Sequence, residues 1–353
     1  MPIHMDDARQ LRRAAGIPNV HFHTANFSTA AALDLPRFDY IVSHGVYTWV
    51  GPEARRAWLH FIERHLKPNG LVYVSYNALP GRAADIPFQR LVRTLGEKLP
   101  GSTSERMTTA LQIAGSMMTL NPPAFTASAL AQRCRDHAGD LDPAYLAHEL
   151  MVQHWEPCCV TDVRAELASI GLRPAGSATL VQNYDRFMLG RAARNILAGI
   201  ADPGAHELAR DMLINQGFRR DVYVRGGEEI GEPERSRRLM DSSFFLSVPP
   251  DSVEYAFSTP AGSVKFDNRA ARHIVEELVA GPRRLADLAA TEISTQDILA
   301  NAVALTAATT LWPVESAHAP IDGINNAIRS RAGTPDEIRV QALPFGTAVP
   351  VPT

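Results

Sequence analysis

Two short apolar runs on either side of one amphipathic segment constrain the fold more than any other feature of this sequence. The runs, Phe38–Val42 and Leu71–Ser75, have the length of buried strands. Between them Pro52 suits the first position of a helix, and Lys67–Gly70 suits its end. Apolar residues recur there at helical spacing: Ala54, Ala57, Trp58, Phe61, Ile62 and Leu66. The pattern predicts a βαβ unit with two parallel strands, and with Trp58, Phe61 and Ile62 facing the sheet.

The rest of the chain predicts two further segments. We expect a partial α/β domain over residues 1–95, a mainly helical domain over 96–195, and a winged-helix-like α+β domain over 196–353 with an extended tail from Pro335. A hairpin around Thr259–Gly262, followed by helices, motivates the winged-helix assignment. Val20–Thr24 and Leu180–Val181 are further strand candidates, and Asp6 and Asp7 can cap a short helix over Ala8–Ala15.

Composition narrows the classes of protein. The net charge of −3 argues against a nucleic-acid binder that works by bulk charge. Three cysteines are too few for a disulfide framework, which favours a reducing compartment. No apolar run is long enough to span a membrane. Neither the Cys158–Cys159 pair nor His21 with His23 has enough further ligands for a metal site. We therefore expect a cytoplasmic protein that binds no metal, nucleic acid or membrane.

Four separated motifs resemble one known family. Phe38–Val50 and Leu66–Gly81 resemble the fourth and fifth strands of class I S-adenosylmethionine-dependent methyltransferases. Tyr145–Glu149 together with His154–Pro157 resembles the signature of a methyltransferase regulatory domain, and Phe218–Gly226 resembles the entry to the region after it. The sequence is therefore similar to a bacterial subgroup in which a Rossmann-like catalytic sheet precedes a regulatory domain. Some members of that subgroup methylate protein lysines.

The resemblance implies a cofactor crevice at the carboxyl ends of the parallel strands. It implies contacts to S-adenosylmethionine from Asn26, Phe27, Ser43, His44 and Gly45, catalytic roles for His44, Tyr47 and Tyr76, and contacts to the methyl acceptor from Tyr47, Trp49, Asn77, His148 and Glu149. A histidine can take a proton, and aromatic rings can wall a slot for an amine. Two purely structural alternatives stay open: Tyr47 and Trp49 can be core residues, and His148 and Glu149 can belong to a structural network.

One departure from the family pattern leaves the function open between two classes. Such methyltransferases begin with a strand, a glycine-rich loop and a second strand, but only 19 residues precede Val20 and none forms a G-x-G-x-G motif. The chain is either a methyltransferase that acts on an amine or another nucleophile, or a non-catalytic binding or regulatory protein that has lost its cofactor. Without the loop we expect weak cofactor binding, and from the open sheet edge we expect fraying of residues 1–37 or self-association.

Overall fold

A computed structural model describes residues 2–137, 142–289, 292–314, 321–330, 340–343 and 347–350. They fall into two compact units, Phe27–Gly227 and a second unit that combines Met1–Asn26 with Glu228–Thr353. The division into 1–95, 96–195 and 196–353 stays a prediction.

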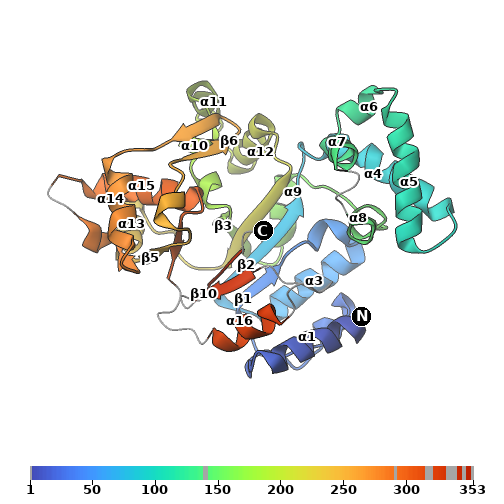
Figure 1. Ribbon diagram of the computed structural model, residues 1–353, viewed down its shortest axis with the longest axis horizontal. Helices are drawn as coiled ribbons and strands as arrows, with labels where there is room; N and C mark the ends of the chain where they lie inside the picture. Colours follow the sequence, from blue (N-terminus) through green and yellow to red (C-terminus); the bar gives the residue numbers. More distant parts are fainter. Residues whose placement is uncertain are drawn as a thin grey trace. The chain divides into compact units, whose positions relative to one another are not determined.

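A four-stranded sheet organises the larger unit (Figure 1). Its strands lie in the order β1 (Phe38–Ser43), β2 (Leu66–Asn77), β4 (Phe218–Arg225) and β3 (Leu172–Ser177). β1 and β2 are parallel, with Ile41 opposite Val72, so the predicted parallel pair is confirmed. β4 is antiparallel to both of its neighbours. The sheet therefore joins segments that lie about 150 residues apart in the sequence.

Helix α3 (Pro52–His65) packs on this sheet as its apolar spacing predicts. Trp58 and Ile62 are buried, and the half-buried Phe61 packs against the same core. Helix α9 (Val160–Ala168) adds Val163 and Leu167 to that core. On β1, by contrast, Tyr40 and Val42 are 70% and 69% exposed, so the far face of this edge strand is left uncovered within the described residues.

A helical subdomain extends from the end of β2. It contains α4 (Ile86–Lys98), α5 (Thr103–Met118), α6 (Pro123–Thr126), α7 (Ala129–Asp136) and α8 (Pro143–Leu150). α5 begins with a capping box between Ser102 and Glu105, which satisfies two free amides at its start. Buried Val92, Met107 and Leu146 belong to a core that is separate from the core of the sheet. The predicted helical character of this stretch is confirmed.

The segment between β3 and β4 corrects one expectation. The strand predicted at Leu180–Val181 is wrong, because those residues lie in a short 3-10 helix, η3 (Leu180–Asn183), and the strand is β3. Asn183 is the cause: its Oδ1 accepts from the Ser177 amide, and its Nδ2 donates to the Ser177 and Leu180 carbonyls. Such local side-chain bonds compete with strand pairing. The connection to β4 continues through α10 (Asp185–Met188), α11 (Arg191–Leu197) and α12 (Pro203–Ile214).

The smaller unit contains five helices and three small sheets among its described residues. The helices are α1 (Pro2–Ala14), α13 (Glu232–Asp241), α14 (Arg269–Leu278), α15 (Thr295–Ala307) and α16 (Asp322–Arg329). A three-stranded sheet has the order β8 (Arg283–Arg284), β5 (Ser243–Leu246) and β9 (Leu311–Pro313). β6 (Ala256–Thr259) with β7 (Gly262–Lys265), and β10 (Val340–Leu343) with β11 (Thr347–Pro350), form hairpins. The hairpin around Thr259–Gly262 is thus confirmed, while the winged-helix assignment stays a prediction.

Two expectations for the N-terminal segment are wrong. Val20–Thr24 forms no strand, because no partner strand among the described residues supplies the hydrogen bonds that an extended segment needs. The first helix begins at Pro2, so Asp6 and Asp7 lie inside it and do not cap it. Of the tail predicted to be extended, residues 335–339, 344–346 and 351–353 lie outside the described residues.

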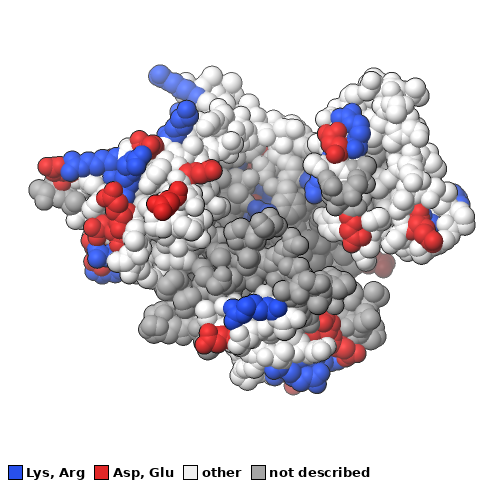
Figure 2. All heavy atoms as spheres, viewed as in Figure 1, with Lys and Arg blue, Asp and Glu red and all other residues white. Residues whose placement is uncertain are grey.

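The remaining short elements of the described chain are the helix α2 (Phe27–Ala30) and the 3-10 turns η1 (Tyr47–Trp49), η2 (Ala83–Asp85), η4 (Pro250–Ser252) and η5 (Leu285–Leu288). None of the described helices has the length and apolar character that crossing a bilayer requires. On the face drawn in Figure 2, basic and acidic side chains lie beside one another. The described residues form ion pairs such as Arg237–Glu234, Arg238–Glu234 and Arg284–Asp287.

Candidate functional site

A cavity of about 490 Å³ opens where β1 and β2 end and β4 begins, and we call it the β1–β2 cavity. Five of the residues predicted from the sequence line it: His44, Gly45, Trp49, Asn77 and Glu149. Ten further residues complete the wall: Arg82, Leu130, Arg133, Cys134, Tyr145, Leu146, Leu150, Trp155, Phe218 and Arg220. The sheet thus supplies one side of the cavity, and helices α7 and α8 supply the other.

The turn after β1 is fixed by hydrogen bonds to β2. The Gly45 amide donates to Ser75 Oγ at 2.9 Å, and His44 Nδ1 lies 2.9 Å from Tyr73 Oη and 3.2 Å from Ser75 Oγ. Gly45 has φ +65°, and apart from Gly45 and its two neighbours in the chain no described atom lies within 4 Å of the position that a Cβ would take. A glycine suits this conformation, and it leaves open space in which a ligand can approach the backbone.

Aromatic rings form much of the wall. Trp49 is half-buried, Trp155 is buried, and Tyr145 on α8 is half-exposed. Phe218 lines the cavity from the first residue of β4. Faces of such rings attract ammonium and methylated ammonium groups, so this wall can hold an amine and its methylated product.

The charged groups of the wall differ in their pairing. Arg82 donates to Asp85 at 3.0 Å and to the Gly217 carbonyl at 3.2 Å. Burial raises the pKa of Glu149, although Arg82 and Arg133 lower it. This carboxyl group is therefore more readily protonated than an exposed glutamate, and it can exchange a proton or hold a cation.

Tyr47 and Tyr76 lie in the core next to the cavity and do not line it. They are 2% and 0% exposed, and burial raises the pKa of both phenols. The Tyr47 hydroxyl donates to Glu166 at 2.5 Å, and the Tyr76 hydroxyl donates to Asp221 at 2.7 Å. Of the predicted aromatic site residues Tyr47, Trp49 and Tyr76, only Trp49 lines the cavity, and rings from other elements complete its aromatic wall.

The structure does not gather the remaining predicted residues around the cavity. Ser43 is buried at the end of β1, and Phe27 packs against the core of the sheet. His148 is exposed on α8, and Asn26 belongs to the other compact unit. The roles of these four residues stay predictions. Within the described residues no group of three or more metal-ligating side chains comes together.

Several wall residues were not predicted as site residues. Tyr145, Trp155 and Phe218 lie in motifs that carry the family resemblance, and the spacing of Tyr145 and Glu149 is a signal that was missed. Residues four apart on a helix share one face, so Tyr145 and Glu149 both line the cavity. Arg82, Arg133 and Arg220 had no comparable local signal.

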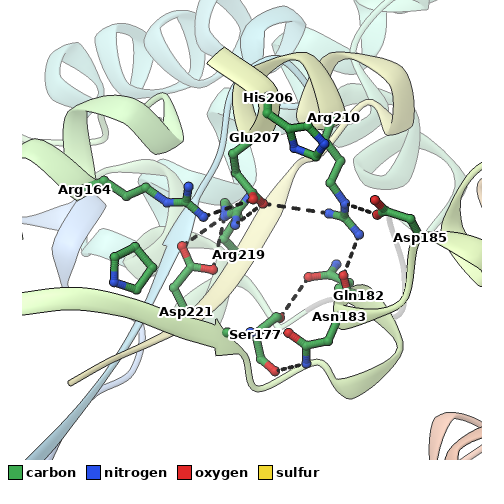
Figure 3. Close-up of a pocket in the computed structure, with 12 residues that line it drawn as sticks. Arg164, Ser177, Gln182, Asn183, Asp185, His206, Glu207, Arg210, Arg219 and Asp221 are labelled. Atoms are coloured by element: carbon green, nitrogen blue, oxygen red, sulfur yellow. Dashed lines mark hydrogen bonds and ion pairs between the residues drawn. The ribbon is translucent and has the colours of Figure 1, made fainter. Parts of the chain in front are cut away.

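A second cavity, of about 260 Å³, lies beside β3, β4 and α12, and we call it the Arg219 cavity (Figure 3). Its centre is the Arg219 cluster, which consists of Glu207, Asp211, Arg219 and Asp221. Arg219 contacts Asp211 at 2.5 Å, Glu207 at 2.9 Å and Asp221 at 3.0 Å. Around the cluster, Arg164 pairs with Glu207 at 3.0 Å and Arg210 pairs with Asp185 at 2.7 Å. Each arginine drawn in this cavity therefore has a carboxylate partner.

Burial and pairing compete within this cluster. Burial alone lowers the pKa of Arg219, but Asp221 and Asp211 raise it above its ordinary value, so the guanidinium stays charged. Burial raises the pKa of Asp211 to about 6 in spite of the nearby Arg219. Asp211 Oδ2 has no hydrogen-bond partner among the described residues, which agrees with the difficulty of ionising this carboxyl group. The contacts of the cluster are those of a structural ion-pair network.

Comparison with known proteins places the chain among methyltransferase-like proteins. A family model described as "Predicted methyltransferase regulatory domain" matches residues 142–225. Protein sll1526 of Synechocystis is 32% identical over 362 residues, an alignment that covers 99% of this chain and 71% of that protein. Protein RP789 of Rickettsia prowazekii is 38% identical over 79 residues, which are 22% of this chain and 14% of that protein.

Solved structures show the same fold. PKMT2 from Rickettsia typhi matches with a TM-score of 0.68 and 20% identity, over 98% of this chain and 73% of that chain. The structure of PKMT2 in complex with AdoHcy matches with a TM-score of 0.66 and 18% identity, with the same shares of the two chains.

Proposed function

Since the chain belongs to the bacterial methyltransferase family that carries a methyltransferase regulatory domain, we propose that it transfers a methyl group from S-adenosylmethionine to the side-chain amine of a protein lysine. The β1–β2 cavity is the proposed site of transfer. The observation that carries the proposal is the convergence of Gly45, Trp49, Asn77 and Glu149 on one cavity at the carboxyl ends of parallel strands.

The residues at the end of β1 fit the methyl donor. The open space over Gly45, with φ +65°, allows a flat adenosyl group to lie against the backbone, and His44 is held beside it by Tyr73 and Ser75. AdoHcy, which PKMT2 binds, is the product that S-adenosylmethionine becomes when it loses its methyl group. When bound, S-adenosylmethionine supplies an electrophilic methyl group on a positively charged sulfur.

In this proposal, residues of this chain position the amine and accept its proton. The aromatic wall of Trp49, Trp155 and Tyr145 holds the amine and excludes water around it. The nitrogen lone pair forms the new N–C bond as the S–C bond breaks, and the bonding electrons stay on the sulfur. A lysine ammonium must lose a proton before its nitrogen can attack, and we assign that proton to His44 or Glu149, whose side chains lie in the wall and can accept one.

The test is methyl transfer by the 353-residue chain from isotopically labelled S-adenosylmethionine to lysine-containing peptides. Because the sequence contains no G-x-G-x-G motif, the assay extends to high donor concentrations. We expect labelled methyl-lysine, and we expect Trp49→Ala to reduce transfer by about tenfold, the size of one cation–π contact. Trp312→Ala, the same substitution in the other unit, serves as the matched control and leaves the rate unchanged.

The alternative function makes a different prediction for the same assay. A non-catalytic binding protein transfers no methyl group at any donor concentration, and Trp49→Ala then has no rate to change. That outcome would overturn the proposed transferase function.

A further inference from the structure

Two arginines in the wall of the β1–β2 cavity, Arg133 and Arg220, form no direct ion pair with a carboxylate among the residues that the structure describes. Arg133 is exposed on α7; its charge lowers the pKa of Glu149, but within the described chain its side chain forms no direct ion pair with that carboxyl group. Arg220 lies over the Phe218 ring at 5.3 Å and donates to Thr179 Oγ1 at 3.4 Å. Both guanidinium groups are therefore available to an anion at the cavity.

This lack of partners distinguishes the cavity from its surroundings. Arg135, on the same helix as Arg133, pairs with Asp136 at 2.9 Å. Arg219, next to Arg220 in the sequence, contacts three carboxylates. The third arginine of the wall, Arg82, pairs with the buried Asp85. Among the described residues, the arginines of the wall that lack a direct ion pair are thus Arg133 and Arg220.

One negative group faces the same space. Glu149 lies four residues after Tyr145 on α8, and both residues line the cavity with Trp49 and Trp155. The wall therefore offers an acid and aromatic faces to a cation, and two guanidinium groups to anions. Guanidinium forks bind carboxylates through paired, charge-assisted hydrogen bonds. Because Phe218 already orients Arg220, less side-chain freedom is lost when it binds.

We propose that the β1–β2 cavity selects acceptor lysines whose neighbouring residues are acidic. In this assignment Glu149 and the aromatic wall hold the lysine amine, while Arg133 and Arg220 hold carboxylates of the adjacent side chains. The inference rests on the proposed function, because it names the class of acceptor for that same site.

The test measures peptide binding and does not depend on turnover. Calorimetry of the full 353-residue chain with AdoHcy compares two peptides with a central lysine, one flanked by aspartates and the other by asparagines. We expect the aspartate peptide to bind about tenfold more tightly, the size of one charge-assisted hydrogen bond. The double substitution Arg133→Gln and Arg220→Gln should abolish the preference. Arg135→Gln, on the same helix but outside the wall, is the matched control and should keep it.

The possible outcomes separate this inference from the proposed function. Equal affinities for the two peptides, no binding of either peptide, or a preference that survives the double substitution would each overturn the inference. It would also be overturned if the double substitution weakened AdoHcy binding and left the preference intact, because the arginines would then hold the cofactor. Methylation of both peptides at equal rates would sustain the transferase function alone. A preference in binding without methyl transfer would sustain acidic recognition alone.

Discussion

Charged side chains on the two faces of β4 differ in whether they form ion pairs within the chain. Arg219 and Asp221 face the Arg219 cavity, where each forms ion pairs or hydrogen bonds with buried neighbours. Phe218 and Arg220 face the β1–β2 cavity, where Arg220 meets a hydroxyl and an aromatic ring but no described carboxylate. Side chains alternate between the faces of a strand, so four consecutive residues divide between the two cavities.

This contrast distinguishes charged residues that stabilise the fold from charged residues that can bind a ligand. A buried charge is tolerated only when its partners come from the protein, as in the Arg219 cluster. An exposed charge beside an aromatic cavity has water as its partner, and a ligand can replace that water. Pairing within the chain therefore marks the Arg219 cavity as a support of the sheet, and it agrees with our proposal that ligands bind in the β1–β2 cavity.

The largest expected effect comes from removing the centre of the cluster. Arg219→Met leaves buried carboxylates without their cation, and we expect it to lower the free energy of unfolding by about 3–5 kcal/mol. Arg220→Met, one residue further along β4, should change it by no more than about 0.5 kcal/mol, because Arg220 is exposed. Denaturant unfolding of the two variants checks this pair. Equal losses of stability would remove the distinction between the two faces.

The pH dependence of stability tests the burial of Asp211. Its pKa in the folded protein is raised to about 6 from an ordinary value of 3.8, mainly by burial. The folded state therefore binds this proton more tightly than the unfolded state. The contribution of the group to stability is full below about pH 4 and is lost as the pH rises through about 6.

Asp211→Asn should remove that dependence. Relative to this variant, we expect the natural protein to lose stability as the pH rises from 4 to 7. The loss in its free energy of unfolding should be no more than about 3 kcal/mol. Unfolding curves at several pH values measure the difference, with the exposed Asp136→Asn as the control. Parallel pH profiles for the natural protein and Asp211→Asn would show that Asp211 ionises normally.

Two tyrosines of β2 test the same comparison between the two cavities, with smaller expected changes in stability. Tyr76 donates to buried Asp221 on the side of the cluster, while Tyr73 lies 2.9 Å from His44 on the side of the β1–β2 cavity. We expect Tyr76→Phe to cost about 1–2 kcal/mol of unfolding free energy, because a buried acceptor loses one donor. Tyr73→Phe should cost less than about 0.5 kcal/mol, because His44 is exposed. Thermal unfolding of both variants tells the two positions apart, and the reverse order of losses would contradict this assignment.

Local sequence patterns predicted the elements that local interactions determine. The apolar spacing of Trp58 and Ile62 identified the face of α3 that packs on the sheet, and Pro52 identified its start. The strand expected at Val20–Thr24 failed because a strand also needs a partner, which its own residues do not specify. The strand expected at Leu180–Val181 failed because Asn183 binds the backbone locally, an effect that hydrophobicity alone does not reveal.

The site was predictable where residues follow directly from a strand end. His44 and Gly45 come immediately after β1, and Asn77 ends β2, so their meeting follows from the parallel pair. Tyr76 precedes Asn77 by one residue and points to the opposite face, which is why it lies in the core and not in the cavity. Arg133 and Arg220 enter the wall from segments distant in the sequence, and only the fold brings them together.

Amide hydrogen exchange of the full chain, with and without AdoHcy and the aspartate-flanked lysine peptide, tests most directly whether the β1–β2 cavity is the ligand site. We expect slower exchange on ligand addition at residues 44–49 and 145–150, which contribute to this cavity. We expect unchanged exchange at residues 177–183 and 206–211, which surround the Arg219 cluster. Slower exchange confined to residues 177–183 and 206–211 would contradict it, because the paired charges would then form the binding site.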